Sequence, residues 1–305
     1  MKNKGVLYAL CAGISWGISL GIFGRTMTSF GFTAMQVSAV RTTISAITFI
    51  ILSLVTDRKA FRLNPKDIWI FLCSGFISVT LFCWCYFTST RLCSLAVGGV
   101  LQYTAPVWVV VFSAVIFKEP ITKVKAAAMA IAIAGCVLVS GITHGVGQVS
   151  AFGLVAGVFS GITYGSYTIF TRFAVPKYRT MTINVYTFIV ASATSLLLSG
   201  PVKTVSAVCT PNVLPVAIIG GIMCAAVPYY FYNKSLETLE NGKASILATI
   251  EPVIAVMVSV FYYKEPLSLE ALIGIALILG AVVILAIQKD GVPAKAEHQE
   301  VQAAK

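Results

Sequence analysis

Ten long apolar runs follow one another along the 305-residue chain, separated by short polar breaks. A helix that crosses the hydrocarbon core of a bilayer needs about 20 mostly apolar residues. The composition agrees with such helices, because 58% of the residues are hydrophobic and only 11% are charged. We therefore predict an all-α integral membrane protein with ten transmembrane helices. Their expected ranges are 5–24, 33–56, 67–88, 92–117, 122–143, 149–171, 181–200, 213–233, 243–263 and 268–288.

The two ends of the chain are predicted to differ. Lys2 and Lys4 precede the first run, as in a signal peptide, but this run exceeds the usual length of about 7 to 15 residues and no cleavage pattern stands before Arg25. We expect the first run to be retained as a helix. The stretch 289–305 is polar and has no apolar stripe, which predicts a disordered cytoplasmic tail.

The net charge of +11 follows the predicted topology. If the N-terminus is cytoplasmic, 17 of the 22 Lys and Arg residues fall in inner loops and ends, 4 fall in outer loops, and Arg41 lies within a run. The positive-inside rule expects this split for an even number of helices. We predict a multi-pass protein of the cell membrane with both termini cytoplasmic, with the lipid bilayer as a partner and no nucleic acid.

The two halves of the sequence repeat one pattern. A shift of 146 aligns residues 101–120 with 247–266, and eight of the twenty positions match, including Pro106 with Pro252 and a final Lys-Glu-Pro. A shift of 144 aligns two glycine ladders, Gly13, Gly17 and Gly21 with Gly157, Gly161 and Gly165. Apolar bias alone does not explain matched prolines, glycines and a charged triplet. We expect the ladders to permit close contact between helices.

Each half would contain five helices, in repeats 1–144 and 145–288. Because five is odd, the second half enters the membrane from the opposite side, which makes the repeat inverted. Inverted repeats are typical of secondary transporters, in which the site lies near the midplane between the halves. Alternating access then follows when the two halves exchange conformations.

Several local patterns accompany this duplication. They are Trp16-Gly17 in the first run, Arg41 in the second, "WCYFTSTRL" at the end of the third, and Pro106 with Glu119, repeated at Pro252 and Glu265. Together they resemble the EamA-type branch of the drug/metabolite transporter superfamily, over about residues 5–287. The resemblance implies a carrier for small metabolites, amino acids or drugs, often an exporter. The two halves have diverged. Ser160 stands at the position in the second half that corresponds to Trp16, and no arginine near Tyr186 corresponds to Arg41.

Glu251 stands in the middle of the ninth run. At a rise of about 1.5 Å per residue it lies roughly 12 Å from Lys243 and roughly 20 Å from Lys264, near the middle of a core about 30 Å thick. A carboxylate there costs on the order of 3 kcal/mol, so it should face the interior of the bundle or a wet cavity. It is either a structural carboxyl that packs helices together or a site for a substrate ammonium group or a proton.

Two prolines mark the same depth in the two halves. Pro252 frees the carbonyl of Ala248, and Pro106 frees that of Gln102, because proline has no N–H. Freed carbonyls at membrane depth need protein partners or a cavity. Either the prolines only kink their helices, or the polar residues beside them belong to one site layer. The candidates for this layer are Gln102, Tyr103, Thr104 and Glu251.

Arg41 and several aromatic residues complete the candidates. Arg41 lies roughly 12 Å inside its run, and it either extends toward the outer surface or pairs with Glu251 or an anionic substrate group. The aromatic residues either line a cavity or pack and form interfacial belts. They are Trp16, Trp84, Tyr86, Tyr164 and Tyr167.

Other classes of function find less support in the sequence. An intramembrane enzyme needs a catalytic constellation, but the aspartates stand at loops, and neither His144 nor His298 lies within a run. The eight cysteines are read as small buried hydrophobes. We therefore expect a non-enzyme without metal or cofactor, carrying a small molecule. A channel or a receptor-like helical protein remains the alternative, and the oligomeric state is open, with a monomer as one option.

Overall fold

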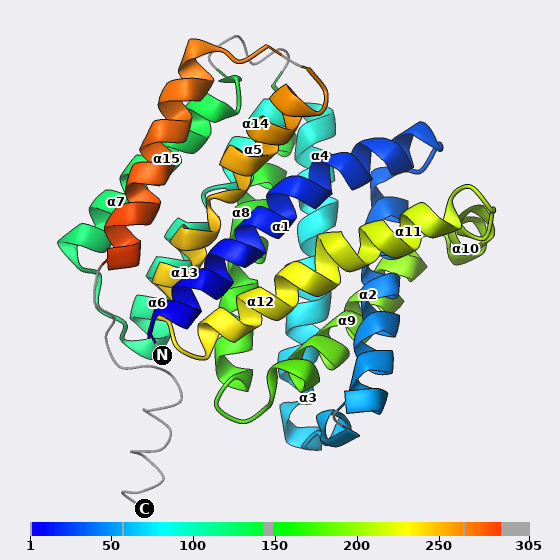
Figure 1. Ribbon diagram of the computed structural model, residues 1–305. Helices are drawn as coiled ribbons and strands as arrows, with labels where there is room; N and C mark the ends of the chain where they lie inside the picture. The colour runs from blue at the N-terminus through cyan, green and yellow to red at the C-terminus, as the bar shows by residue number, and fades with distance from the viewer. Residues whose placement is uncertain (1, 57, 143–148, 265, 288–305) are drawn as a thin grey trace, which may run out of the picture.

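The computed structural model describes residues 2–56, 58–142, 149–264 and 266–287, and within these ranges it contains helices and no strand (Figure 1). Each of the ten apolar runs forms helix. The uninterrupted helices are α1 (Lys2–Ser29), α2 (Ala34–Thr56), α7 (Lys123–Val139), α8 (Ala151–Ala174), α9 (Thr180–Ser199) and α15 (Leu269–Ile287). The predicted tail 289–305 lies outside the described residues, as does Glu265.

The other runs are interrupted, and in the same way in both halves. The third run is α3 (Ile68–Leu72), a π-helical segment (Cys73–Leu81) and α4 (Phe82–Leu92), and the eighth is α11 (Leu214–Gly221), a π-helical segment (Ile222–Ala226) and α12 (Val227–Leu236). The fourth run is α5 (Leu95–Gln102) and α6 (Ala105–Phe117), and the ninth is α13 (Asn241–Ala248) and α14 (Glu251–Phe261). Outside the runs lie α10 (Pro201–Val208) and the 3₁₀ turns Arg58–Phe61 and Pro65–Asp67.

Eight stretches of the described chain are long and apolar enough to cross a membrane. The helices α7 and α8 are not among them. The first has only 17 residues, and the second carries several hydroxyl side chains in its C-terminal half, between Thr163 and Thr171. The multi-pass, all-helical class is confirmed, whereas the count of ten membrane crossings stays a prediction.

The two prolines begin new helices after a break. Pro106 is the second residue of α6 and Pro252 is the second residue of α14. Proline fits the first turn of a helix because the N–H that it lacks would have no intrahelical partner there. The chain therefore leaves the helix at residues 103–104 and 249–250 and re-enters it at the proline. In Figure 1, α5–α6 and α13–α14 run in opposite directions.

The Lys-Glu-Pro triplet is a signal that ends a helix. Lys118 (φ 55°) and Lys264 (φ 59°) are the non-glycine residues with positive φ in the described chain. Lys118 caps α6 in the left-handed conformation, and its N–H donates to the carbonyl of Ser113. A left-handed residue followed shortly by proline is a common helix ending. In the second half α14 ends at Phe261, and Lys264 takes the same left-handed conformation three residues further along the chain.

Loops that were predicted to share a side of the membrane lie together. The loops around residues 58–66, 118–125, 172–179 and 234–243 occupy the lower end of the molecule in Figure 1, and we call it the basic end. Side-chain contacts join them, including the backbone N–H of Asn64 to the Tyr178 hydroxyl (3.2 Å) and Lys125 to Glu240 (2.7 Å). At the opposite end, Arg25 lies 4.2 Å over the ring of Tyr263. Which end faces the cytoplasm stays a prediction.

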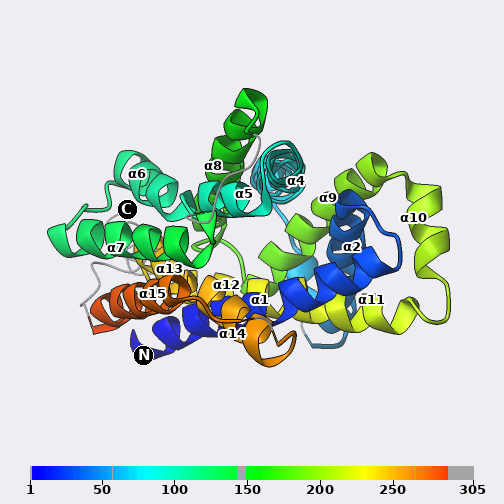
Figure 2. The same ribbon diagram turned by 90° about the horizontal axis from the view of Figure 1, so that it is seen from above.

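The glycine ladders hold the two halves together at the helix breaks. A Cβ on Gly17 would lie 2.6 Å from the backbone oxygen of Glu251, and one on Gly161 would lie 2.7 Å from that of Leu101. The first helix of each half thus packs on the broken helix of the other half, as Figure 2 shows for α1 beside α14. Gly21 differs, because nothing lies within 4 Å of its Cβ position.

Gly17→Ala is expected to destabilise the protein, whereas Gly21→Ala serves as its matched control. The added methyl group must displace backbone at the break, and overpacking of this kind costs about 1–3 kcal/mol. The measurement is the thermal unfolding midpoint of the purified protein in detergent. We expect a lower midpoint for Gly17→Ala and an unchanged midpoint for Gly21→Ala. Equal midpoints for the two variants would contradict the close approach.

Candidate functional site

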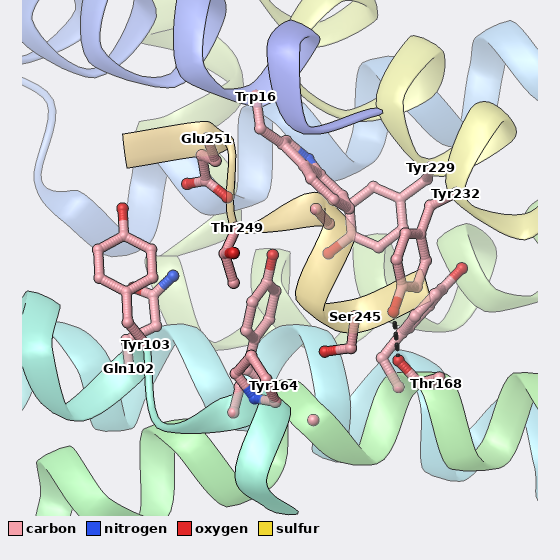
Figure 3. A pocket seen from close by; sticks show the side chains of 15 residues that line it. Trp16, Gln102, Tyr103, Tyr164, Thr168, Tyr229, Tyr232, Ser245, Thr249 and Glu251 are labelled. Atoms are coloured by element: carbon pink, nitrogen blue, oxygen red, sulfur yellow. Dashed lines mark hydrogen bonds between the residues drawn. The ribbon is translucent and has the colours of Figure 1, made fainter. Parts of the chain in front are cut away.

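A cavity lies where the two broken helices meet. It holds about 500 Å³ of empty space, including the space at its mouth. One wall is formed by Gln102, Tyr103, Ala105 and Pro106 of the first half. Another wall is formed by Ser245, Ala248, Thr249 and Glu251 of the second half. The complete lining is Trp16, Gln102, Tyr103, Ala105, Pro106, Tyr164, Gly165, Tyr167, Thr168, Tyr229, Tyr232, Ser245, Ala248, Thr249 and Glu251 (Figure 3). Both repeats therefore build this site.

Aromatic rings from α1, α8 and α12 form one end of the cavity. Trp16 meets Tyr229 edge to face, with ring centroids 5.2 Å apart, and Tyr229 meets Tyr167 at 4.9 Å. The hydroxyl groups of Tyr232 and Thr168 lie 2.7 Å apart, as the dashed line in Figure 3 marks. Edge-to-face contacts and hydrogen bonds fix the orientation of such rings. This end of the cavity is therefore an ordered aromatic surface.

A buried polar network supports the aromatic surface from behind. The hydroxyl of Tyr167 donates to Asn233 Oδ1 at 3.1 Å, and Asn233 Nδ2 donates to Asn184 Oδ1 at 2.6 Å. Both asparagines are fully buried. Because the three residues belong to α8, α12 and α9, the network ties three helices together behind the cavity.

Glu251 is the first residue of α14, and its carboxylate faces the cavity on the side of Gln102 and Tyr103 (Figure 3). It is 9% exposed, and within the described part of the chain it has no hydrogen-bond or ion-pair partner. The hydroxyl groups of Tyr103 and Tyr164 likewise have no hydrogen-bond partner among the described residues. Unused hydrogen-bonding capacity is thus concentrated around the cavity.

Arg41 lies apart from this lining. Its Nη2 donates to the sulfur of Cys83 at 3.2 Å, and the Ser38 hydroxyl donates to the same sulfur at 3.1 Å. Arg41 is 9% exposed and attracts Glu251 through space, but no ion pair joins the two among the residues that the structure describes. The predicted pairing of Arg41 with Glu251 stays a prediction.

The structure brings Trp16, Gln102, Tyr103, Pro106 and Glu251 together in the cavity, along with Tyr164 and Tyr167. Four other predicted residues are not part of the lining. Trp84 is 47% exposed, and Tyr86 stacks on Phe82. The Thr104 hydroxyl donates to the Leu101 carbonyl, and Pro252 is buried. Five further polar or aromatic lining residues were not predicted from the sequence: Thr168, Tyr229, Tyr232, Ser245 and Thr249. A signal did exist for Tyr232, because the shift of 146 aligns it with Tyr86.

Four charged residues and one asparagine at the basic end form a second cluster, the basic-end network, made of Glu119, Lys125, Arg172, Glu240 and Asn241. Lys125 Nζ lies 2.7 Å from Glu240 Oε2, with the two side chains 4% and 10% exposed. Glu119 Oε1 accepts from the backbone N–H of Asn241 at 3.1 Å and lies 4.0 Å from Arg172 Nη2. Burial raises the pKa of the Glu119 carboxyl. The network thus joins the end of the first half's fourth helix to the turn before α13.

Within the described residues, three positions of this network have uncharged counterparts at the opposite end of the molecule. The repeat shifts of 146 and 144 place Ser94, Ala271 and Thr28 at the positions of Glu240, Lys125 and Arg172. These residues are uncharged, so they cannot form ion pairs. Ser94 instead caps α5, where its hydroxyl accepts from the N–H of Val97. Among the described residues, the Lys125–Glu240 ion pair therefore has no counterpart at the opposite end.

Comparison with known proteins gives consistent matches. The profile of the EamA-like transporter family matches residues 3–141 and 151–287. An "Uncharacterized transporter" of Archaeoglobus fulgidus is 29% identical over 65% of this chain and 70% of its own. "Uncharacterized transporter YetK" of Bacillus subtilis is 22% identical over 97% of this chain and 92% of its own. A solved crystal structure with 19% identity has a TM-score of 0.75, covering 92% of this chain and 95% of that one, which supports the fold.

Proposed function

Because the chain belongs to the EamA-like transporter family, we propose that it is a secondary active carrier that exports a small metabolite, amino acid or drug-like solute by alternating access. The observation that carries this proposal is the cavity between the breaks of two helices, one from each half. Sites at discontinuous helices between repeats are typical of secondary transporters.

The breaks let the end of each fourth helix move without the rest of the helix. Residues 103–104 and 249–250 are non-helical, so a change in backbone dihedral angles there swings α6 or α14 about the cavity. The glycine contacts transmit this motion, because Gly17 and Gly161 hold the opposite half against each break. We propose that the two repeats, 1–144 and 145–288, are inverted and exchange such conformations in each transport cycle.

The charge distribution supports an orientation for the cycle. We propose that the protein lies in the plasma membrane with its basic loops and both termini in the cytoplasm. In this orientation the basic-end network closes the cytoplasmic side of the cavity. Ion pairs between buried side chains of α7 and the turn before α13 must separate before the cavity opens on that side. We propose that this network is the cytoplasmic latch and that the structure represents the state in which the latch is closed.

Overexpression should change the small molecules that cells release. The expected result is that at least one small solute accumulates in the medium of cells with the protein and not in cells with an empty vector, because an exporter raises efflux. The same solute, radiolabelled, should then show saturable counterflow in proteoliposomes. Uptake that rises linearly with concentration would indicate a channel, and a metabolite profile that matches the empty vector would contradict export.

A further inference from the structure

The cavity lining contains a single acidic side chain among aromatic rings. Of its 15 lining residues, Glu251 is the one with a charged side chain, and no Lys, Arg or His belongs to the lining. Six of the other side chains are tyrosine or tryptophan: Trp16, Tyr103, Tyr164, Tyr167, Tyr229 and Tyr232. The electrostatic character of the site is therefore that of one carboxylate beside the faces and hydroxyl groups of aromatic rings.

The carboxylate of Glu251 lacks a partner from the protein. It is nine-tenths buried, it faces the cavity, and no described residue gives it a hydrogen bond or an ion pair. A buried charge without a partner is costly, and a ligand of opposite charge removes that cost. Arg41 does not fill this role, because its guanidinium donates to Cys83 and stands outside the lining.

The aromatic lining favours the same kind of ligand. A cation over the face of Trp or Tyr is attracted by the negative face of the ring, and Trp is the best of the aromatic residues in this respect. Trp16 and Tyr164 come from α1 and α8, one from each half, so both repeats contribute rings to the cavity. An anionic group would instead face Glu251 and would find no cation in the lining.

We propose that this site takes a small organic monocation, with a protonated or quaternary ammonium group against Glu251 and an apolar or aromatic body against the tyrosine rings. This inference rests on the proposed transport function, and it names the class of solute. The ammonium group supplies the hydrogen bonds and charge that Glu251 lacks. Gln102 and the hydroxyl groups of Tyr103 and Tyr164 remain for a further polar group of the solute.

Binding of three matched probes to the purified protein tests the solute class. Phenethylamine carries an ammonium group, 2-phenylethanol replaces it with a neutral hydroxyl, and phenylalanine adds a carboxylate. By isothermal titration calorimetry near neutral pH we expect saturable binding of phenethylamine, with the other two probes at least about tenfold weaker. Tighter or equal binding of 2-phenylethanol or phenylalanine, or no saturable binding of phenethylamine, would overturn the proposal.

Variants of Glu251 separate charge from shape. In Glu251→Gln, the affinity for phenethylamine should fall at least about 30-fold while that for 2-phenylethanol stays unchanged, because one partner of a buried charge pair is lost. Glu251→Asp should keep the preference for the amine, and Glu270→Gln, outside the cavity, should match the wild type. A preference retained by Glu251→Gln would overturn the assignment. Counterflow of an uncharged solute would leave the transport function standing while excluding this solute class.

Discussion

Lys125→Met is expected to open the cavity toward the basic end. The Nζ of Lys125 lies 2.7 Å from Glu240 and 3.0 Å from the Pro120 carbonyl, and its side chain is 4% exposed. Methionine keeps most of the volume but removes the charge, and breaking a buried ion pair from one side costs about 3–5 kcal/mol. A change of about 3 kcal/mol shifts a two-state equilibrium roughly 100-fold. The free-energy difference that favours the closed state over the open state therefore becomes small.

Reaction of a cysteine introduced at Ser245, in the cavity lining, with a membrane-impermeant thiol reagent applied to inside-out vesicles measures this opening. Lys123→Met is the matched control, because Lys123 is exposed and lies two residues away. The double variant Lys125→Met/Glu240→Leu should recover part of the closed state, since it removes both charges together. Unchanged labelling in Lys125→Met would contradict the role of the basic-end network as a latch.

Asn233→Leu is expected to lower the stability of the protein. Asn233 is fully buried and bridges Tyr167 and Asn184, so leucine leaves two buried polar groups without a partner. Each such group costs about 1–3 kcal/mol, which gives about 2–6 kcal/mol in total. The measurement is the thermal unfolding midpoint in detergent, with the exposed Asn212→Leu as the control.

A double variant checks that the loss comes from unsatisfied polar groups. The double variant Asn233→Leu/Asn184→Leu also removes the Asn184 amide that lost its hydrogen-bond partner. Its unfolding midpoint should therefore lie above that of Asn233→Leu and below that of the wild type. If Asn233→Leu unfolds at the temperature of the wild type, the hydrogen-bond network does not support the aromatic surface in the way described.

The sequence predicts the helices, the breaks and the glycine contacts because these depend on short-range rules. Run length indicates each membrane helix, and Pro106 and Pro252 predict interruptions where they stand, since proline cannot continue the backbone hydrogen bonds. The contacts of Gly17 and Gly161 follow from the same repeat. These features need no knowledge of which helices are neighbours.

The partners of individual side chains are harder to predict. Lys125 and Glu240 are 115 residues apart, and neither run pattern nor spacing indicates that they meet. Trp84 is exposed although it lies close to Cys83, which is buried. The π-helical segment before α4 has wider turns than an α-helix, so it changes which side chains of α4 face inward.

Side-dependent labelling of one cavity residue tests the central claim, alternating access, most directly. Ser245→Cys in a chain without the eight native cysteines places a single thiol in the cavity lining. With a membrane-impermeant maleimide, we expect labelling mainly from the outside of intact cells, and labelling from the cytoplasmic side once Lys125→Met is added. Equal labelling from both sides in the protein with an intact latch would indicate an open channel and would contradict alternating access.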